Sequence, residues 1–388
     1  MKIVVTGSHF TPAQAVIEQL RKYPHTQIVY LGRSYTREGD QTPSMESQVL
    51  SNLGVKFISL TTGRLQRVFT VHTIPSLLKI PFGFIQAFYV LLKEKPDVVL
   101  SFGGYVGVPV VISAWFLSIP IIIHEQTLVS GLANEISAFF ANKVAISFKG
   151  DQIRKDRRMV FTGNPMRKAI LESYENRSRD KVTALSPDIT QIVKISQKEK
   201  KPLIYITGGN QGSHLINEAI RQILEDLTKV ACIVHQTGDS KFNDFDKMTS
   251  KQKSLSHPQR YLVKKWLEVE DLAELLKKVD LVISRGGINI LYELAYFSIP
   301  TLVIPIPYLY KDEQTTNACY FGKLGLAQVL WQVDLTAEKL YQTVAKMLKN
   351  LPQLKKQAQN AHPIAIADAA KRLALETLLL GDRESHLR

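Results

Sequence analysis

The stretch from Leu203 to Leu224, LIYITGGNQGSHLINEAIRQIL, constrains the fold more than any other part of the chain. It begins with a pattern that predicts a buried strand, and the apolar spacing after Ser213 is that of a helix. Between them lies GGNQG, in which glycine permits a sharp turn and the close approach of a ligand. Unpaired amides and the helix macrodipole favour an anion at such a helix start. Taken alone, the stretch fits a diphosphate-binding turn and an ordinary strand-to-helix connection equally well.

A second glycine turn of the same kind occurs further along the chain. Ser284-Arg285-Gly286-Gly287 follows an apolar strand pattern, and a helical pattern begins after it. The first residues of that helix, Ile288, Asn289 and Ile290, would offer their amides to an anion. Two such turns in one half of the chain favour the diphosphate interpretation.

Strand-like segments alternate with helical patterns in the first half of the chain. This alternation predicts an α/β fold with a parallel, doubly wound sheet, in which ligands bind beyond the carboxyl ends of the strands. The predicted strands are Lys2–Val5, Ile28–Leu31, Val55–Leu60, Val98–Phe102, Pro120–His124 and Lys143–Phe148. The side chains expected at that edge of the sheet are His9, Gly103, Gly104, His124 and Glu125.

The same alternation resumes in the second half, after a polar stretch from Tyr174 to Lys201 that reads as a linker or surface excursion. The predicted strands here are Leu203–Thr207, Cys232–His235, Tyr261–Val263, Leu281–Ser284, Thr301–Ile304 and Ala327–Leu330. We therefore expect two Rossmann-like domains facing a central cleft. The expected divisions are residues 1–165, a linker over 166–201, a second domain over 202–360, and a C-terminal helix within 361–388 that packs back on the first domain.

The net charge indicates the kind of binding partner, and the cysteine content indicates the cellular compartment. The formal net charge of +14 favours an anionic partner, for which nucleic acid, anionic lipid and a phosphorylated substrate all qualify. No recognisable nucleic-acid module is present, so a nucleic-acid partner is not expected. Cys232 and Cys319 lie far apart and form no metal-binding spacing, which suggests a reduced cytosolic protein. The N-terminal residues do not resemble a signal peptide, and no apolar run is long enough to span a membrane.

Five motifs, in order and covering nearly the whole chain, carry a family resemblance. They are FGGYVGVPVVISAWFLSIPIIIHEQ from Phe102, GNPMR from Gly163, GGNQGSHLIN from Gly208, SRGGINILYELAYFSIP from Ser284, and KDEQTTNA from Lys311. In these motifs the chain resembles the MurG family of peptidoglycan glycosyltransferases. The resemblance implies a GT-B fold. It also implies inverting, metal-independent transfer of N-acetylglucosamine from UDP-N-acetylglucosamine to the undecaprenyl-linked muramyl-pentapeptide, lipid I to lipid II. Such enzymes are peripheral proteins at the cytoplasmic face of the bacterial cell membrane and need no cofactor.

The resemblance assigns the donor to the second domain. Glu293 is expected to accept hydrogen bonds from both ribose hydroxyls, which suits a carboxylate. Leu267 matches the position whose backbone reads uracil, although simple core packing explains it as well. Gln314 is expected to bind the sugar hydroxyls, and Glu313 stands where the family often has His. The remaining donor-binding residues implied are Arg167, Asn210 (where the family usually has Ser), Gln211, Gly212, Gly287, Ile288, Asn289, Ile290, Leu291 and Tyr292.

The resemblance assigns the lipid pyrophosphate to the glycine loops of the first domain. The residues implied are Thr6, Gly7, Ser8, Gly103, Gly104, Tyr105 and Thr127. Ser8 replaces a family glycine and narrows the allowed backbone angles, and Thr127 replaces the usual Asn. The acceptor hydroxyl must lose a proton, and a base of pKa near neutral contributes usefully; His9 is the first candidate and Glu125 the second. The alternative for His9 is a loop histidine that only packs.

Two further sequence features leave alternatives open. Ile74 to Leu92 is strongly apolar, and the nearby cations are Arg64, Arg67, Lys79, Lys93 and Lys95. This segment fits an anionic membrane surface and a core helix with a basic edge equally well. Asp244-Phe245-Asp246 spells the DxD that holds a divalent ion in other glycosyltransferases, but its polar surroundings predict a solvated loop and no metal site.

Two functional alternatives also stay open. One is a related GT-B transferase with another lipid acceptor, such as a diacylglycerol, because the donor half would look the same. The other is a non-catalytic nucleotide-sugar-binding protein, which the altered first glycine loop favours. The presence of Arg167, Glu293 and Gln314 argues against that second alternative.

Overall fold

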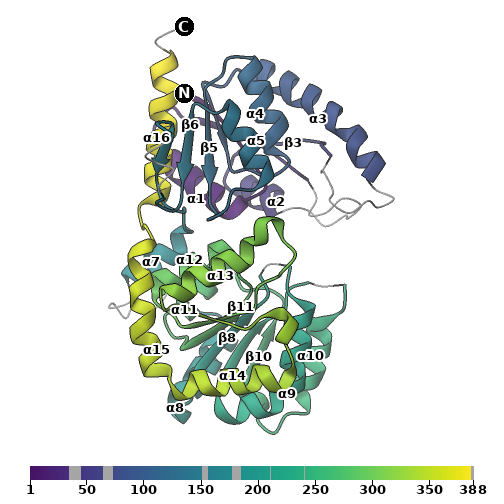
Figure 1. The fold of residues 1–388 in the computed structure, drawn as a ribbon, viewed down its shortest axis with the longest axis vertical. Helices are drawn as coiled ribbons and strands as arrows, with labels where there is room; N and C mark the ends of the chain where they lie inside the picture. The colour runs from purple at the N-terminus through teal and green to yellow at the C-terminus, as the bar shows by residue number, and fades with distance from the viewer. Residues whose placement is uncertain are drawn as a thin grey trace. The chain divides into compact units, whose positions relative to one another are not determined.

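The computed structural model describes residues 1–34, 45–63, 73–150, 156–176, 185–209, 211–239 and 241–385. The chain forms two compact units (Figure 1). The first comprises Met1–Arg167 together with Ile366–Arg388, and the second comprises Lys168–Ala365. The chain therefore leaves the first unit once and returns to it at its C-terminal end.

The described part of the first unit contains a parallel sheet of seven strands in the order β3-β2-β1-β4-β5-β6-β7. The strands are β1 Lys2–Thr6, β2 Gln27–Gly32, β3 Lys56–Ser59, β4 Val98–Ser101, β5 Ile121–Glu125, β6 Lys143–Ile146 and β7 Met159–Phe161. The short edge strand β7 was not predicted. The helices are α1 Phe10–Leu20, α2 Met45–Asn52, α3 Thr73–Glu94, α4 Gly107–Phe116, α5 Leu132–Phe140 and α16 Ala369–Ser385.

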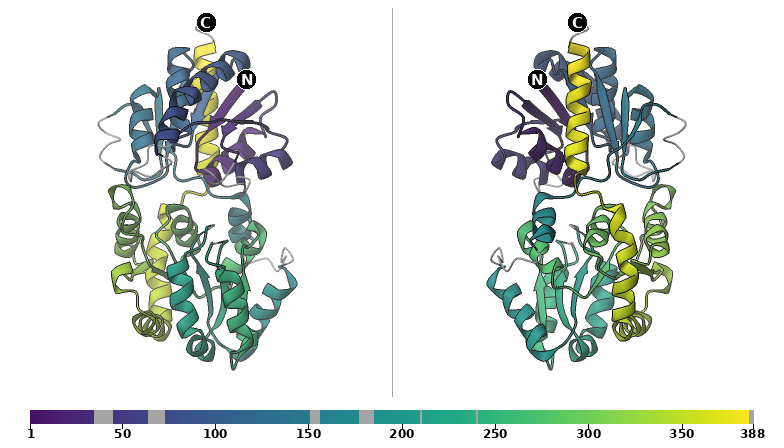
Figure 2. Two further views of the ribbon diagram at one scale, coloured as in Figure 1. Left: turned by 90° about the vertical axis from the view of Figure 1, so that its right-hand side faces the viewer. Right: turned by 90° about the vertical axis from the view of Figure 1, so that its left-hand side faces the viewer.

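Both faces of this sheet are covered, because its strands are apolar on both sides. Ile3 and Val5 of β1 join a core with residues of α1, α2 and α16. Val4 between them points to the other core, which α3, α4 and α5 complete. The C-terminal helix α16, yellow in Figures 1 and 2, packs against α1 and β4.

The described part of the second unit repeats this plan with a parallel sheet of six strands in the order β10-β9-β8-β11-β12-β13. The strands are β8 Leu203–Thr207, β9 Cys232–Gln236, β10 Tyr261–Lys264, β11 Leu281–Ser284, β12 Thr301–Val303 and β13 Ala327–Val329. The helices are α7 Lys168–Glu175, α8 Pro187–Glu199, α9 His214–Val230, α10 Asp244–Lys253, α11 Val269–Leu276, α12 Ile288–Phe297, α13 Glu313–Lys323, α14 Ala337–Lys349 and α15 Leu351–Ala358. Short 3₁₀ turns occupy Pro258–Arg260, Tyr310–Asp312, Gln332–Asp334 and Gln359–Ile364.

The strand orders confirm the predicted doubly wound α/β class. Each sheet reverses its order once, between β1 and β4 in the first unit and between β8 and β11 in the second. Open α/β sheets bind ligands at this point of reversal. A glycine turn predicted from the sequence follows each of these four strands, so each unit places its pair of turns side by side.

The linker expected over residues 166–201 is wrong for its described part. These residues belong mostly to α7 and α8, and α8 buries Ile189, Ile192 and Val193 against β9 and β10. The apolar residues of α8 are few and widely spaced among polar ones, so local composition resembles a linker although the helix has a packed face. The C-terminal segment was expected to begin at residue 361. It begins at Ile366 instead, since residues through Ala365 lie in the second unit.

In the part of the chain that the structure describes, no helix combines the length and apolarity needed to cross a bilayer.

Candidate functional site

The glycine turn after β8 has the geometry of a ligand-binding loop. Gly209 and Gly212 have φ of 84° and 72°, which glycine adopts without strain. A Cβ at Gly212 would lie 1.9 Å from the carbonyl oxygen of Thr237, so a larger residue cannot fit there. Gly212 and Gln211, both predicted to bind phosphate, therefore pack on the loop that follows β9. Asn210, the third predicted residue, lies outside the described residues.

Arg285, which the sequence analysis did not select, joins the two glycine turns of the second unit. Its Nε and Nη2 donate to Ser213 Oγ at 3.0 and 2.7 Å. Its Nη1 donates to the carbonyl oxygen of Ile304 and to Gln332 Oε1. Burial lowers the pKa of Arg285 to about 10, so the guanidinium stays charged at neutral pH. The sequence signal that could have identified Arg285 is a basic residue between a buried strand and a pair of glycines.

This bond explains why the start of α9 remains open to a ligand. Ser213 is the N-cap residue of α9, but its hydroxyl accepts from Arg285 and makes no capping bond to the helix amides. At α12 the N-cap residue is Gly287, which has no side chain. Both helices thus begin without a side-chain cap, and uncapped amides are the groups that bind anions at helix starts.

Four other predicted donor residues lie in or beside helix α12, and they differ in whether they keep a polar group for a ligand. Glu293 is 2% exposed within α12, and Tyr292 is buried beside it. Leu291 has no group available for a ligand, because its side chain is buried and its amide donates to the Gly287 carbonyl. Gln314 accepts at Oε1 from the amides of Gly286 and Ile306, which leaves its Nε2 without a partner in the described chain.

Leu267 and Arg167 are the remaining predicted donor-binding residues. Leu267 follows β10 and is half-buried, outside the hydrophobic core of the second unit, so core packing does not account for it. Arg167 is the last residue of the N-terminal segment of the first unit and is partly exposed. Its contact with the nucleotide remains a prediction.

In the first unit, Gly7 is the position that requires glycine. Its φ is 134°, and a Cβ there would lie 2.7 Å from the carbonyl carbon of Phe102. Ser8 has no positive φ, and its amide donates to the Gly103 carbonyl at 2.9 Å. The expected backbone restriction at Ser8 therefore costs nothing, because this position does not use a glycine-only conformation. The Ser8 side chain instead packs against Gly104, where a Cβ would lie 2.2 Å from Ser8 Oγ.

Several predicted acceptor-binding groups already have intramolecular partners. Thr6 is buried and its hydroxyl donates to the Leu31 carbonyl, so it cannot donate to a substrate. Glu125 is 7% exposed and accepts at Oε1 from the Thr127 amide and hydroxyl and at Oε2 from Asn134 Nδ2. A carboxylate held in this way orients its neighbours and is poorly placed to accept another proton. Tyr105 is half-buried against the core of the first unit.

His9 is the more available base of the two candidates. It is the N-cap residue of α1 and is exposed. Desolvation by neighbouring protein atoms, and secondarily the charge of Arg33, lowers the pKa of His9, and the exposure of the side chain limits this desolvation. The ring is therefore neutral at pH 7 and can accept a proton.

A second histidine lies below the first unit's loops. His124, at the end of β5, is 1% exposed, and its Nε2 lies 3.2 Å from Ser147 Oγ. Burial lowers the pKa of His124 to about 4. Its Nδ1 has no partner in the described chain. The sequence placed His124 at this edge, but only burial shows that it is a neutral, internal group.

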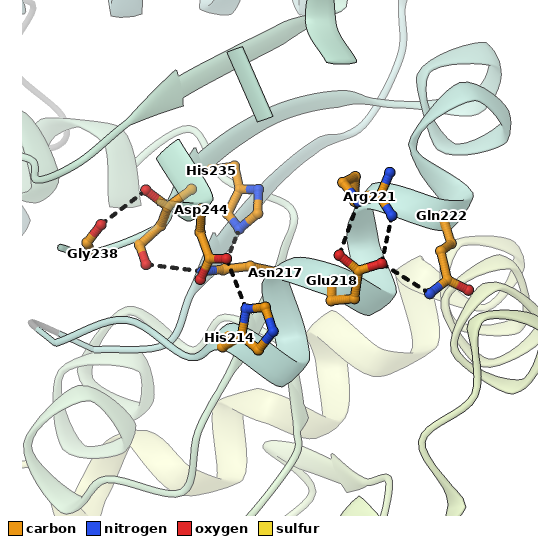
Figure 3. A network of polar contacts seen from close by, with 9 residues as sticks. His214, Asn217, Glu218, Arg221, Gln222, His235, Gly238 and Asp244 are labelled. Carbon is orange, nitrogen blue, oxygen red and sulfur yellow. Dashed lines mark hydrogen bonds and ion pairs between the residues drawn. The ribbon is translucent and has the colours of Figure 1, made fainter. Parts of the chain in front are cut away.

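The solvated loop expected at Asp244-Phe245-Asp246 is wrong. These residues begin α10, and Asp244 is 3% exposed and paired with His214 (Figure 3). The partners of Asp244 come from distant positions in the sequence, which local composition cannot reveal. Among the described residues, no group of three or more His, Cys, Asp or Glu side chains could hold a metal ion.

Comparison with known proteins agrees with this architecture. The glycosyltransferase family 28 N-terminal domain matches residues 3–146, and the C-terminal domain of that family matches residues 203–373. The UDP-N-acetylglucosamine–N-acetylmuramyl-(pentapeptide) pyrophosphoryl-undecaprenol N-acetylglucosamine transferase of Clostridium botulinum strain Loch Maree is 31% identical over 361 residues, which cover 90% of this chain and 91% of the relative. Transferase 2 of the same description from Bacillus cereus strain ATCC 10987 is also 31% identical, over 90% of this chain and 92% of the relative.

Solved structures show the same fold. The crystal structure of Acinetobacter baumannii MurG covers 97% of this chain and 99% of its own, with a TM-score of 0.68 and 24% identity. A UDP-GlcNAc 2-epimerase from Neisseria meningitidis, solved with UDP-GlcNAc, covers 98% of this chain and all of its own, with a TM-score of 0.64 and 18% identity. These likenesses confirm the predicted GT-B class of two Rossmann-like domains. With two matching family domains and curated relatives at 31% identity over nine-tenths of its length, the chain belongs to glycosyltransferase family 28 and, within it, to the MurG family.

Proposed function

We propose that this protein transfers N-acetylglucosamine from UDP-N-acetylglucosamine to undecaprenyl-pyrophosphoryl N-acetylmuramyl-pentapeptide, a step of peptidoglycan synthesis. The reaction matches the names of its curated relatives. The structural observation that carries the proposal is the pair of uncapped helix starts, α9 and α12, at the point where the second sheet reverses its order. Arg285 joins the two starts, so both can face one diphosphate.

In the donor site, the amides at the starts of α9 and α12 hold the diphosphate. Glu293 accepts from the ribose hydroxyls, and the free Nε2 of Gln314 donates to a sugar hydroxyl. The backbone of Leu267 reads the uracil, and Arg167 contributes a further cation. Leu291 is not part of this proposal, since both its amide and its side chain are already used.

The transfer itself is a single displacement. The acceptor hydroxyl oxygen attacks the anomeric carbon, the bond from that carbon to the β-phosphate oxygen breaks, and UDP leaves with the electron pair. Attack from the opposite face inverts the anomeric centre. His9 takes the hydroxyl proton. The helix dipoles and the Arg285 charge stabilise the departing diphosphate, so the reaction is metal-independent.

The surface of the first unit supports docking on an anionic membrane. α3 buries Ala87, Val90 and Leu91, as a core helix does, and it also exposes a row of large apolar side chains, which supports the membrane proposal. The exposed set is Phe82, Ile85, Phe88, Tyr89 and Leu92 from α3, Trp115 and Phe116 from α4, and Phe139 from α5. α4 packs against both α3 and α5. Lys93 and Lys95 are exposed at the end of α3. An apolar surface beside cations suits a peripheral protein at the cytoplasmic face of the bacterial membrane.

One observation favours a second candidate function, in which the acceptor is a different lipid. Ser8 adds a hydroxyl to the first acceptor loop and packs it against Gly104, where a family glycine would leave space. A narrower loop could select a different lipid headgroup, such as that of a diacylglycerol, with the same donor.

Transfer of labelled N-acetylglucosamine to defined lipid acceptors tests the proposed reaction. We expect label in the muramyl-pentapeptide lipid, undiminished by EDTA, and none in diacylglycerol. Loss of transfer on chelation would reject the metal-independent mechanism. Transfer to diacylglycerol alone would establish the other acceptor, and absence of any UDP release would leave a non-catalytic binder.

Replacing Glu293 by Gln removes the charge from the ribose contact with little change in shape. We expect the KM for UDP-N-acetylglucosamine to rise about 10- to 100-fold, the loss of a hydrogen bond to a charged group. Glu338→Gln, an exposed glutamate of α14, is the matched control and should leave KM unchanged. An unchanged KM in the Glu293 variant would remove Glu293 from the ribose role.

Replacing His9 by Gln should lower kcat by about 10² to 10⁴, the usual contribution of a general base. Because the pKa of His9 is lowered below its ordinary value of 6.5, its neutral form persists below that pH. Activity should therefore fall only as the pH drops through that lowered pKa, where the ring becomes protonated and cannot accept. The measurement is the pH profile of kcat/KM. A wild-type acid limb near pH 6.5, lost in the variant, would contradict this lowered pKa.

Replacing Phe82 and Ile85 together by Ser should weaken binding to vesicles that contain anionic lipid. Burying one such side chain contributes about 1.5–3 kcal/mol, so a loss of about 10-fold or more in vesicle affinity is expected. Vesicle co-sedimentation measures this. Val333→Ser, at an exposed residue of the second unit, should have no effect. Equal binding by all three proteins would show that α3 does not contact lipid.

A further inference from the structure

A buried polar chain connects the start of α9 to the loop after β9 and the start of α10 (Figure 3). His214 Nδ1 lies 2.8 Å from Asp244 Oδ1, and Asn217 Nδ2 donates to Asp244 Oδ2 at 2.9 Å. Asn217 Nδ2 also donates to the Thr237 carbonyl, and Asn217 Oδ1 lies 3.0 Å from His235 Nε2. The chain ends deeper in the unit, where His235 Nδ1 meets the hydroxyl of Tyr261 at 2.9 Å.

The donors and acceptors in this chain can be assigned in only one way. Burial lowers the pKa of His235 to about 3, so its ring is neutral. Asn217 Oδ1 can only accept, and therefore His235 Nε2 donates to it and Nδ1 accepts from Tyr261. The two amide hydrogens of Asn217 then go to Thr237 and Asp244. Asp244 is thus held as a buried acceptor, and the hydrogen on His214 must be on Nδ1.

This assignment leaves one polar atom of the hydrogen-bonded chain without a partner among the described residues. His214 Nε2 has no partner in the part of the chain that the structure describes, and the side chain is 31% exposed. The orientation of the His214 ring is also restrained, because the ring stacks on Phe242 with 4.0 Å between ring centroids and 15° between ring planes. His214 is the first residue of α9, two positions after Gly212 of the diphosphate loop. The loop carrying Phe242 is the one whose Gly238 packs on that same glycine loop.

Charged groups of both signs lie around His214. Asp244 faces its Nδ1 from α10, and Glu218 lies one turn later on α9, where its pKa is lowered chiefly by Arg221 and in small part by the His214 charge. Lys241 Nζ lies 5.4 Å from the centroid of the Phe242 ring, and the positive end of the α9 dipole lies at His214 itself. A diphosphate at the helix start would offset both of these positive charges.

We propose that His214 is a donor-binding residue, whose protonated Nε2 donates to the diphosphate of the nucleotide sugar and whose position Asp244 sets. The inference rests on the proposed donor site at Gly208–Gly212. With Nδ1 committed to Asp244, a neutral ring has no second hydrogen to donate, so donation from Nε2 to the diphosphate requires a second proton on the ring. The affinity for the donor therefore increases as the pH falls.

Calorimetric titration with UDP-N-acetylglucosamine, in buffers of different ionisation enthalpy, measures both affinity and proton uptake. This ligand is suitable because its diphosphate is esterified at both ends and does not itself titrate near neutral pH, unlike a terminal phosphate with a second pKa of about 6. At pH 7.5 we expect the unaltered protein to take up a fraction of one proton. His214→Gln should bind about 10-fold more weakly, as for loss of one charge-assisted hydrogen bond, and take up none.

Two further variants separate the alternatives. His257→Gln makes the same substitution at a half-buried histidine before the Pro258–Arg260 turn, and it should retain both affinity and proton uptake. Asp244→Asn keeps an acceptor for Nδ1 but removes the charge, so its proton uptake should fall; if it fails to fold, the half-exposed His214 variant still decides the matter. A His214→Gln protein with wild-type affinity and uptake would overturn the inference while leaving the donor site intact. Absence of binding by the unaltered protein would overturn the donor site itself.

Discussion

The hydrogen bonds from Arg285 to Ser213 are the contact on which the proposed donor site depends. They connect the turn after β8 to the turn after β11 and use the hydroxyl that would otherwise cap α9. The guanidinium stays charged in a buried position, which is tolerated because every one of its nitrogens donates to an oxygen. One interaction thus opens a helix start and adds positive charge beside it, the two properties that an anionic leaving group requires.

Close backbone packing at glycines puts both pairs of loops in place. Gly212 approaches the Thr237 carbonyl and Gly7 approaches Phe102 more closely than any Cβ would allow. In each unit these contacts occur at the reversal of strand order, so the loops after adjacent strands support each other. The second unit adds the chain of His235, Asn217 and Asp244 beneath its loop, which fixes the ring of His214 at the start of α9.

The structure sorts the predicted site residues by what their polar atoms already do. Thr6 and Leu291 have no group left for a ligand, and Glu125 is held by Thr127 and Asn134. Gln314 keeps only its Nε2, which suits a donor to a sugar hydroxyl. The family resemblance named these positions, but it could not show which groups had intramolecular partners. Arg285, His214 and Asp244 were missed for the same reason, since their roles depend on contacts with residues distant in the sequence.

The sequence by itself determined the alternation of strands and helices, the two doubly wound sheets and the four glycine turns, because apolar period and glycine content are local properties. It also determined the family, through motifs spread over the whole chain. Only the tertiary structure decided that the residues from Pro187 to Glu199 form the packed helix α8, and that Asp244 lies buried at the start of α10. Burial and hydrogen-bond partners arise from segments brought together in space, and no local pattern of residues specifies them.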